Sequence, residues 1–377
     1  MDNNPGRLLA RSSRKSNSLP HGLFLHKLTQ VDRIDFRSDT VTWPTPSMRR
    51  AMAKASLGDD VYGEDPTVNQ LEALAAEKTG TEAGLFVSSG TMGNIAAILS
   101  HANRGDEAIL GIDSHVMTSE GGGMSVLGGI MPKPVATDRK GMISRVELAS
   151  AISPDDPHFP RTKLIVVENT YGSKNGYPLP PQYFEQVASV AKENGLSVHM
   201  DGARLFNAAV AQSVDVKEIT GHIDSVSFCL SKGLCAPVGS VLCGSKPFID
   251  KARRMRKVLG GGMRQAGILA AAGIVALEEM VDRLAIDHAN AQTLADGLSE
   301  IPGIELEREL IKTNIVFFDL DPRLIVDADH LVKTLRDRYG IWLGVDGATR
   351  IRAVTHYWVG DAEVNLLLNK LRELVQF

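Results

Sequence analysis

Apolar and polar positions along the middle of the chain repeat with two different periods. From residue 81 onward, short β-rich runs bounded by glycine or polar residues alternate with longer stretches of helical periodicity. This alternation predicts a mainly parallel sheet covered by helices, which is the doubly wound α/β class. Strands are expected at 85–87, 108–112, 163–168, 197–200 and 225–230, and helices at 92–102 and 182–193.

After about residue 285 the pattern changes to an α+β arrangement. A strand is expected at 313–319, a helix at 329–338 and another strand at 350–354. The apolar residues of the last helix gather on one face, which is ordinary amphipathic packing. We therefore expect a large domain over residues 35–284 and a smaller C-terminal domain over residues 285–377.

Residues 1–34 differ from the rest, because they carry six arginines and lysines among serines and only two acids. This composition resembles an organellar transit peptide weakly, although no clear amphipathic helix or cleavage signal is visible. The sequence favours a basic, flexible N-terminal tail, with the transit peptide as the alternative.

Composition narrows the class of function. The 377 residues are 43% hydrophobic and 23% charged, with a formal net charge of −4. These values argue against a disordered chain and against a nucleic-acid binder. The longest apolar run, 266–277, is shorter than the roughly 20 residues of a membrane span. The cysteines at 229, 235 and 243 have no paired spacing, so we expect reduced, buried thiols in a cytoplasmic protein rather than disulfides or a zinc site.

Polar segments follow four of the predicted strands directly. In doubly wound sheets, ligands bind beyond the carboxyl ends of the strands, so residues at these ends are where chemistry is expected. The four polar segments together indicate a binding site more strongly than any one of them does alone. The segments are 88–91, 168–171, 201–204 and 231–232.

Lys232 and Asp201 suggest the cofactor pyridoxal phosphate (PLP). PLP chemistry needs a lysine to carry the aldehyde as a Schiff base and an acid to keep the pyridinium nitrogen protonated. Lys232 follows an apolar strand, where burial would lower its pKa and make the amine a nucleophile. Alone, such a lysine more often snorkels to the surface, and Asp201 is equally a helix N-cap. Arg204, three residues after Asp201, favours a polar site.

Other candidates are weaker on spacing alone. Gly90 and Thr91 sit where a strand turns into a helix, so backbone N–H groups and a hydroxyl could bind a phosphate, although such residues usually only cap helices. His115 follows a predicted strand and could stack on a cofactor ring, yet a lone histidine is more often structural. Lys257 and Arg264 flank a glycine-rich loop that could reach a phosphate or simply be solvated.

Several motifs carry a family resemblance. From about residue 35 to the C-terminus the chain resembles the threonine aldolases, within the β-eliminating lyase group of PLP fold type I enzymes, which have the aspartate aminotransferase-like fold. The matching segments are Asp35-Phe36-Arg37-Ser38-Asp39-Thr40-Val41-Thr42, Gly58-Asp59-Asp60-Val61-Tyr62-Gly63-Glu64-Asp65-Pro66-Thr67, Ser89-Gly90-Thr91-Met92-Gly93-Asn94, 199–207 and 231–239.

This resemblance implies a role for each candidate. Lys232 would be the Schiff-base lysine, Asp201 would pair with the pyridine nitrogen, and His115 would stack on the ring. Other residues would hold the cofactor phosphate and the substrate carboxylate. Gly90 and Thr91 would hold the phosphate, and Ser38, Arg204 and Arg352 would hold the substrate carboxylate, which suits bidentate arginine contacts.

The resemblance also implies shared active sites in an obligate oligomer, commonly a tetramer built as a dimer of dimers. Lys257 and Arg264 would come from a neighbouring subunit to complete the phosphate site. Tyr62 would lie near the same subunit boundary and contribute to the substrate site.

Two departures from the family pattern affect the substrate side. Tyr171 stands where the family usually has a histidine expected to contact the β-hydroxyl of the substrate. Residues 116–119, Val-Met-Thr-Ser, stand where related enzymes often carry bulky aromatics.

Two reactions therefore compete. In the first, His115 acts as base in retro-aldol cleavage of L-threonine or L-allo-threonine to glycine and acetaldehyde. In the second, an amino-acid racemase breaks the Cα–H bond, with Lys232 on one face and Tyr171 on the other. Other β-eliminating lyases, a transaldolase and an inactive binding protein on the same fold are further alternatives, and the presence of both Lys232 and Asp201 argues against the last. No metal ligand set is expected.

Overall fold

The chain forms two units, Met1–Arg33 and Ile34–Phe377. The structure, a computed structural model, describes residues 33–324 and 326–375. The tail predicted over residues 1–34 therefore lies almost wholly outside the described residues. Everything below concerns the second unit.

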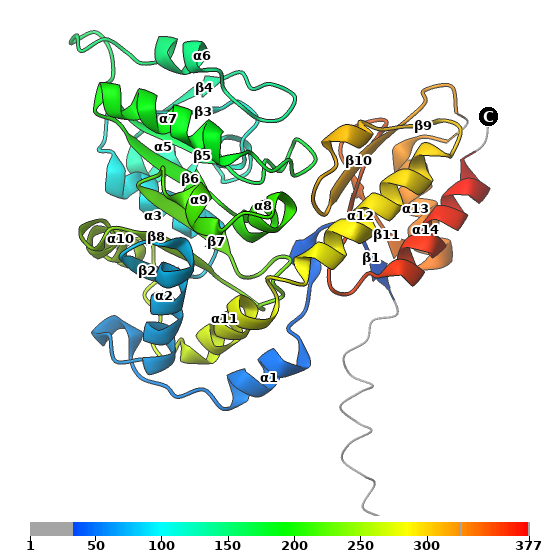
Figure 1. Ribbon diagram of the computed structural model, residues 1–377, viewed down its shortest axis with the longest axis horizontal. Coiled ribbons are helices and arrows are strands. Elements are labelled where there is room, and N and C mark those ends of the chain that lie inside the picture. The colour runs from blue at the N-terminus through cyan, green and yellow to red at the C-terminus, as the bar shows by residue number, and fades with distance from the viewer. Residues whose placement is uncertain (1–32, 325, 376–377) are drawn as a thin grey trace, which may run out of the picture. The chain divides into compact units, whose positions relative to one another are not determined.

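A seven-stranded sheet forms the centre of the larger part of this unit (Figure 1). Four of its neighbouring pairs are parallel, which confirms the prediction of a mainly parallel α/β sheet. One strand, β8, runs antiparallel to both of its neighbours, β2 and β7. The strand order is β2 (Ala83–Val87), β8 (Ser240–Gly244), β7 (Ser225–Cys229), β6 (Ser197–Asp201), β5 (Thr162–Glu168), β3 (Glu107–Gly111) and β4 (Met131–Val135).

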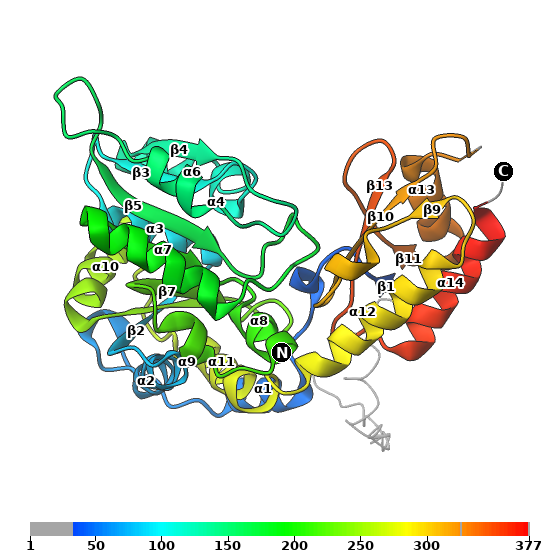
Figure 2. The same cartoon turned by 45° about the horizontal axis from the view of Figure 1, so that its top comes forward.

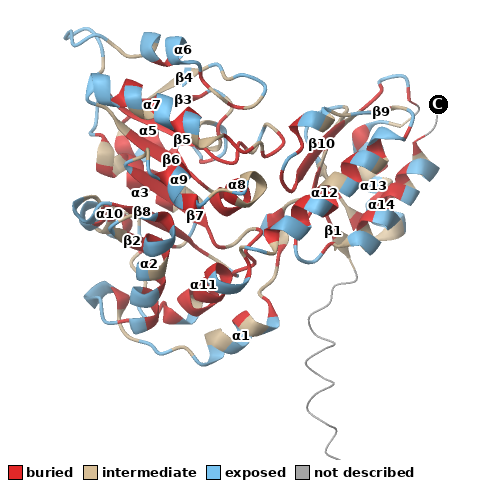
Figure 3. Ribbon diagram, in the orientation of Figure 1, coloured by how far each residue is buried: buried red, intermediate tan, exposed pale blue. Residues whose placement is uncertain are grey.

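Helices cover both faces of this sheet, so its central strands are buried on both sides (Figures 2 and 3). Local signals set their ends: α7 begins with a proline at its first turn and ends at Gly195 in the left-handed conformation. One face carries α3 (Gly90–His101), α5 (Gly123–Gly128) and α10 (Lys246–Val258). The other carries α2 (Pro66–Thr79), α7 (Pro181–Asn194), α8 (Leu205–Gln212) and α9 (Val216–Thr220).

Shorter elements and outer helices complete this part of the unit. Helices α1 and α11 pack on each other, and α11 also packs on α2. The bounds are η1 (Asp39–Val41), α1 (Pro46–Ala53), η2 (Asp60–Tyr62), α4 (His115–Thr118), α6 (Arg145–Ser150) and α11 (Gly267–Glu279).

The C-terminal residues build a second, antiparallel sheet with its own apolar cluster. Its order is β12 (Gly344–Val345), β13 (Arg350–Val354), β10 (Ile315–Leu320) and β9 (Ile304–Glu305). It is accompanied by α12 (Leu284–Ser299), η3 (Arg308–Leu310), α13 (Ala328–Tyr339) and α14 (Asp361–Leu374).

The N-terminal strand joins this C-terminal part rather than the large sheet. Strand β1 (Ile34–Asp35) pairs in parallel with β11 (Ile341–Trp342), and Phe36 is fully buried in the C-terminal cluster. This differs from the expectation that residue 35 opens the large domain, because short apolar segments do not reveal which distant strand they will pair with. None of the described helices combines the length and apolarity that crossing a membrane requires.

Candidate active site

A cavity of about 450 Å³ opens at the carboxyl ends of β5, β6 and β7. It brings together five of the residues singled out in the sequence, and residues of the C-terminal sheet close its other side. The predicted residues in its lining are Ser38, His115, Arg204, Lys232 and Arg352. They are joined by Arg37, Asp113, Thr118, Ser119, Glu168, Thr170, Phe317 and Asp346, among others.

Lys232 lies in the turn between β7 and β8, where its side chain faces the cavity. Its backbone carbonyl accepts a hydrogen bond of 2.9 Å from Thr42 Oγ1, which fixes the turn from outside the sheet. The lysine is partly exposed, whereas we expected it to be buried. The following residues, 233–236, are the buried ones, so the apolar character around the lysine reflects their packing and leaves the amine accessible to a ligand.

The buried Asp201 lies next to His115, which lines the cavity. Asp201 ends β6 and is only 3% exposed, and its Oδ2 lies 3.9 Å from Nδ1 of His115. An isolated buried carboxylate is unfavourable, so this acid suits a cationic partner such as a pyridinium. The ligand atoms of His115, Glu120 and Asp201 lie within 4.8 Å of one another, a spacing that would also accommodate a metal ion.

Sequence reasoning missed two acids that hold His115. Glu120 Oε1 lies 2.9 Å from Nδ1 of His115, and this hydrogen bond, before other causes, raises the pKa of the histidine. Glu168 Oε2 accepts a hydrogen bond of 2.7 Å from the backbone N–H of His115. Burial, followed by the charge of Asp201, raises the pKa of Glu168 to about 7. Glu168 could have been found, because it ends one of the four predicted strands, but nothing marked Glu120.

The first turn of α3 lies close to the strand that leads to Lys232. A Cβ atom at Gly90 would lie 3.0 Å from Sγ of Cys229, so a glycine lets the helix begin directly against β7. Ser89 caps this helix by accepting a hydrogen bond from the N–H of Met92. Gly90 and Thr91 are not part of the cavity lining described above, and their contact with a phosphate stays a prediction.

The two predicted carboxylate-binding arginines have different surroundings. Arg204 is 8% exposed and donates two hydrogen bonds to the fully buried Asp39, from Nε at 2.7 Å and from Nη2 at 2.6 Å. Despite burial, the charge of Arg204 holds the pKa of Asp39 far below its usual value. Arg352 extends from β13, and its buried Nε has no hydrogen-bond partner among the described residues. Burial lowers the pKa of Arg352 to about 10, so it stays protonated at neutral pH.

Tyr171 does not enter the cavity. Its neighbours Thr170 and Gly172 line the cavity, but the Tyr171 side chain turns into the apolar core, where the residue is 2% exposed. Its hydroxyl donates a hydrogen bond of 2.9 Å to Oδ1 of Asp113. Burial, with the charges of Glu168 and Asp113, raises the pKa of the Tyr171 hydroxyl well above its ordinary value. The structure therefore does not support Tyr171 as a catalytic base.

Three predicted residues lie elsewhere on the surface of the chain. Tyr62, in η2, is 75% exposed, and Lys257 is exposed in the last turn of α10. Arg264 Nη1 pairs with Oδ2 of Asp59 at 3.0 Å, close to the start of η2. A single chain thus leaves all three outside the cavity lining. They are accompanied by the exposed apolar side chains of Leu57, Val61, Val258 and Ile268.

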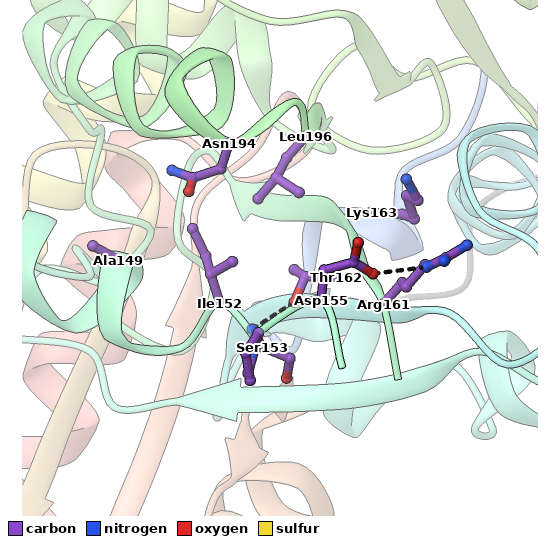
Figure 4. Close-up of a pocket in the computed structure, with 10 residues that line it drawn as sticks. Ala149, Ile152, Ser153, Asp155, Arg161, Thr162, Lys163, Asn194 and Leu196 are labelled. Atoms are coloured by element: carbon purple, nitrogen blue, oxygen red, sulfur yellow. Dashed lines mark hydrogen bonds and ion pairs between the residues drawn. The ribbon is translucent and has the colours of Figure 1, made fainter. Parts of the chain in front are cut away.

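A second cavity, of about 620 Å³, lies at the other end of the sheet, where β5 begins (Figure 4). Its polar groups are largely paired with each other. Arg161 Nε donates to Asp155 Oδ1 at 3.2 Å, and Ser153 N–H donates to Thr162 Oγ1 at 2.9 Å. Both members of the ion pair are strongly exposed, so this cavity offers less chemistry than the first.

Comparison with known proteins agrees with the site. The profile of the Beta-eliminating lyase family matches residues 35–321. The chain is 48% identical over 346 residues to "Probable low-specificity L-threonine aldolase 2" of Arabidopsis thaliana, covering 90% of this chain and 97% of that protein. It is 49% identical over 284 residues to "Low specificity L-threonine aldolase" of Escherichia coli (strain K12), covering 75% and 84%.

Solved structures confirm fold type I. Threonine aldolase of Leishmania major superposes with a TM-score of 0.76 at 21% identity, covering 90% of this chain and 99% of that one. Serine palmitoyltransferase of Sphingomonas wittichii superposes with a TM-score of 0.71 at 19% identity, covering 91% and 87%. Taken with the sequence matches, these similarities show that the chain belongs to the threonine aldolases of the beta-eliminating lyase family.

Proposed function

We propose that this protein is a PLP-dependent threonine aldolase, which cleaves L-threonine or L-allo-threonine to glycine and acetaldehyde. The observation that carries the proposal is that Lys232 and His115 line one cavity, with the buried Asp201 next to His115, its Oδ2 3.9 Å from Nδ1. Those residues supply an amine, a buried acid and a base at the carboxyl ends of β7, β6 and β3. The named relatives, at 48% and 49% identity, support the same reaction.

The described residues fit the cofactor. The accessible amine of Lys232 would hold its aldehyde carbon, buried Asp201 would pair with its ring nitrogen, and the first turn of α3 would receive its phosphate. When bound, PLP withdraws the electron pair that is released as a bond at Cα breaks. His115, next to Asp201, would contact the ring.

Arg352 is the stronger candidate for the substrate carboxylate. Its guanidinium faces the cavity with a buried, unpartnered Nε, whereas two donors of Arg204 are already occupied by Asp39. Ser38 lies in the same lining and can add a hydroxyl donor. Fixing the carboxylate orients the amino acid, and hence decides which Cα bond stands perpendicular to the cofactor ring. His115 would then accept the proton of the β-hydroxyl while the Cα–Cβ bond breaks.

The racemase alternative loses its second base. Two-base racemisation removes the Cα proton on one face and returns a proton on the other, and Tyr171 was the candidate opposite Lys232. Its hydroxyl instead donates to Oδ1 of Asp113, and Tyr171 itself is not part of the cavity lining. The aldolase reaction needs no group at that position, because His115 lies in the lining.

A homotetramer with shared sites is the proposed assembly. A neighbouring subunit would bring its Lys257, Arg264 and Tyr62 to the cavity, because within one chain these residues lie outside the cavity lining. The exposed apolar side chains around Tyr62 support an interface there, since large exposed apolar groups often mark contact surfaces. We further propose a cytoplasmic location, in keeping with three unpaired, buried cysteines.

The experiment supplies purified protein with L-threonine and L-allo-threonine and measures acetaldehyde. In parallel, L-alanine in heavy water is analysed for chirality and for deuterium at Cα. Acetaldehyde release without alanine racemisation is expected, and the reverse result would overturn the proposal. Lys232→Ala should abolish the visible absorbance of the covalently held cofactor, and its retention would contradict the assignment of the lysine.

A further inference from the structure

A row of hydrogen bonds connects the core of the sheet to the ring of His115. His199 Nε2 lies 3.1 Å from Asn94 Oδ1, and Asn94 Nδ2 donates to Glu120 Oε1 at 2.8 Å. The same Glu120 oxygen is 2.9 Å from Nδ1 of His115. Asn94, Glu120 and His199 are buried, so water does not compete strongly for these bonds.

When Glu120 is ionised, the donors and acceptors in this row allow only one assignment of which group donates each hydrogen bond. A carboxylate only accepts hydrogen bonds, so both Asn94 and His115 must donate to it. The amide of Asn94 then turns its carbonyl to His199, which must carry its proton on Nε2. Burial lowers the pKa of His199 to about 3, so this histidine is neutral and has only that one proton to place.

The far end of the row is consistent with the same direction. His199 Nδ1 lies 2.9 Å from Ser225 Oγ and can accept its hydroxyl proton. Ser225 Oγ in turn lies 2.7 Å from Nε2 of His101, which can donate to it. Burial lowers the pKa of His101 to about 4, so it too is neutral. It donates to Ser225 in the tautomer that is protonated on Nε2. Every link from His101 to His115 thus pairs one donor with one acceptor.

We propose that Glu120 and Asn94 are positioning residues that keep the ring proton of His115 on Nδ1, which leaves Nε2 as the atom that accepts the substrate's β-hydroxyl proton. This inference rests on the proposed function. Nε2 of His115 has no hydrogen-bond partner among residues 33–324 and 326–375, and the side chain is 43% exposed in the cavity lining. The backbone of His115 is held as well, by Glu168. The ring is therefore fixed at two points with one nitrogen directed to the ligand space.

The charge of Glu120 has a second consequence. When His115 accepts a proton at Nε2 it becomes a cation, and Glu120 is the acid that directly contacts that cation through Nδ1. The other charged groups that face the histidine are Asp201 and Glu168, which favour its protonated form, and Lys232, which opposes it. Removing the charge of Glu120 should lower the pKa of His115, because the hydrogen bond that His115 donates to this carboxylate, and the charge of the carboxylate itself, both raise that pKa.

The kinetic test compares Glu120→Gln with the wild-type holoenzyme on L-threonine over a range of pH. Glutamine keeps an acceptor oxygen for Asn94 and His115 but loses the charge. We expect kcat to fall by roughly tenfold or more, but by less than the full ~10²–10⁴-fold that a general base contributes, with KM changed little. The acidic limb of kcat/KM should move to lower pH. Glu107→Gln, which makes the same change at a buried glutamate at the opposite end of β3 from His115, is the matched control and should change neither.

An unmoved acidic limb in Glu120→Gln would overturn the proposal, because a purely structural role for Glu120 would reduce activity without shifting that limb. A second readout does not depend on activity. In holoenzyme labelled with ¹⁵N-histidine, the signals lost in His115→Asn identify His115, and their shifts report which ring nitrogen carries the proton. A neutral ring protonated on Nε2 in the wild type would refute the inference. If the wild type releases no acetaldehyde, the proposed function fails. The ¹⁵N measurement still reports which nitrogen of His115 carries the proton, so the two failures can be distinguished.

Discussion

Removing a single hydroxyl, in Tyr171→Phe, separates the two reactions that the sequence leaves open. The ring of Tyr171 is 2% exposed and packs in the core, so phenylalanine fills the same space. What is lost is the hydrogen bond of 2.9 Å to Asp113. We expect the variant to be less stable and to keep its activity.

The size of the loss follows from the surroundings of Asp113. Its carboxylate also accepts a hydrogen bond of 3.0 Å from Thr137 Oγ1 and pairs with Lys174, so it does not become unpartnered. These contacts outweigh burial and lower the pKa of Asp113, so it is ionised at neutral pH. Hydrogen bonds to charged groups contribute about 1.5–3 kcal/mol, and the remaining partners place the expected loss near the lower end, ~1.5 kcal/mol.

The assay measures the free energy of unfolding in urea at a fixed PLP concentration, since ligand binding shifts apparent stability. Acetaldehyde release and alanine racemisation are measured on the same preparations. Tyr183→Phe is the matched control, because Tyr183 is another core tyrosine, whose hydroxyl accepts a hydrogen bond of 3.2 Å from the backbone N–H of Ile143. Loss of activity by tenfold or more in Tyr171→Phe, with unchanged stability and normal activity in the control, would refute our placement of Tyr171.

Two further predictions concern the arginines. Arg352→Lys should raise KM for L-threonine by roughly 10–100-fold, because a bidentate charged contact contributes about 1.5–3 kcal/mol, while Arg350→Lys, two residues earlier on β13, should leave KM unchanged. An equal effect of both variants would contradict the role of Arg352. Asp39→Asn should destabilise the fold by about 3–5 kcal/mol, since it leaves Arg204 charged, buried and unpaired. The low pKa of Asp39 means that the wild-type pair is lost only as pH falls into the strongly acidic range, so wild type and variant measured at neutral pH should show the full difference.

Much of the fold follows from local patterns. The predicted strands at 163–168, 197–200 and 225–230 match β5, β6 and β7 to within about two residues, because near-continuous apolar runs are typical of parallel strands buried on both faces. The strand predicted at 350–354 coincides with β13. Strand β8 was not predicted, nor was its antiparallel insertion between β2 and β7, since a five-residue apolar segment carries no signal for direction or neighbour.

The site was predictable as far as strand ends reveal it. Lys232 and Arg204 were singled out because they follow strands, and both line the cavity, as does Glu168, which ends β5 but was not singled out. Contacts between residues far apart in the sequence could not be read in this way. Arg204 is paired with Asp39, which lies 165 residues earlier, and that pairing changes which arginine is available to a substrate. The direction of the Tyr171 side chain likewise depends on tertiary packing rather than on its place in a motif.

Residues 36–42, the segment between β1 and the large sheet, connect the two sides of the cavity. This segment follows β1, which pairs with the C-terminal part, and it then places Ser38 in the cavity lining and Asp39 on Arg204. Thr42, at its end, donates a hydrogen bond to the carbonyl of Lys232. In the proposed reaction, contacts to the substrate carboxylate would come from this segment and from β13, whereas the groups that act on Cα and the β-hydroxyl would come from the large sheet. Because the two sets lie on different elements, changes in the first should act mainly on KM and changes in the second on kcat.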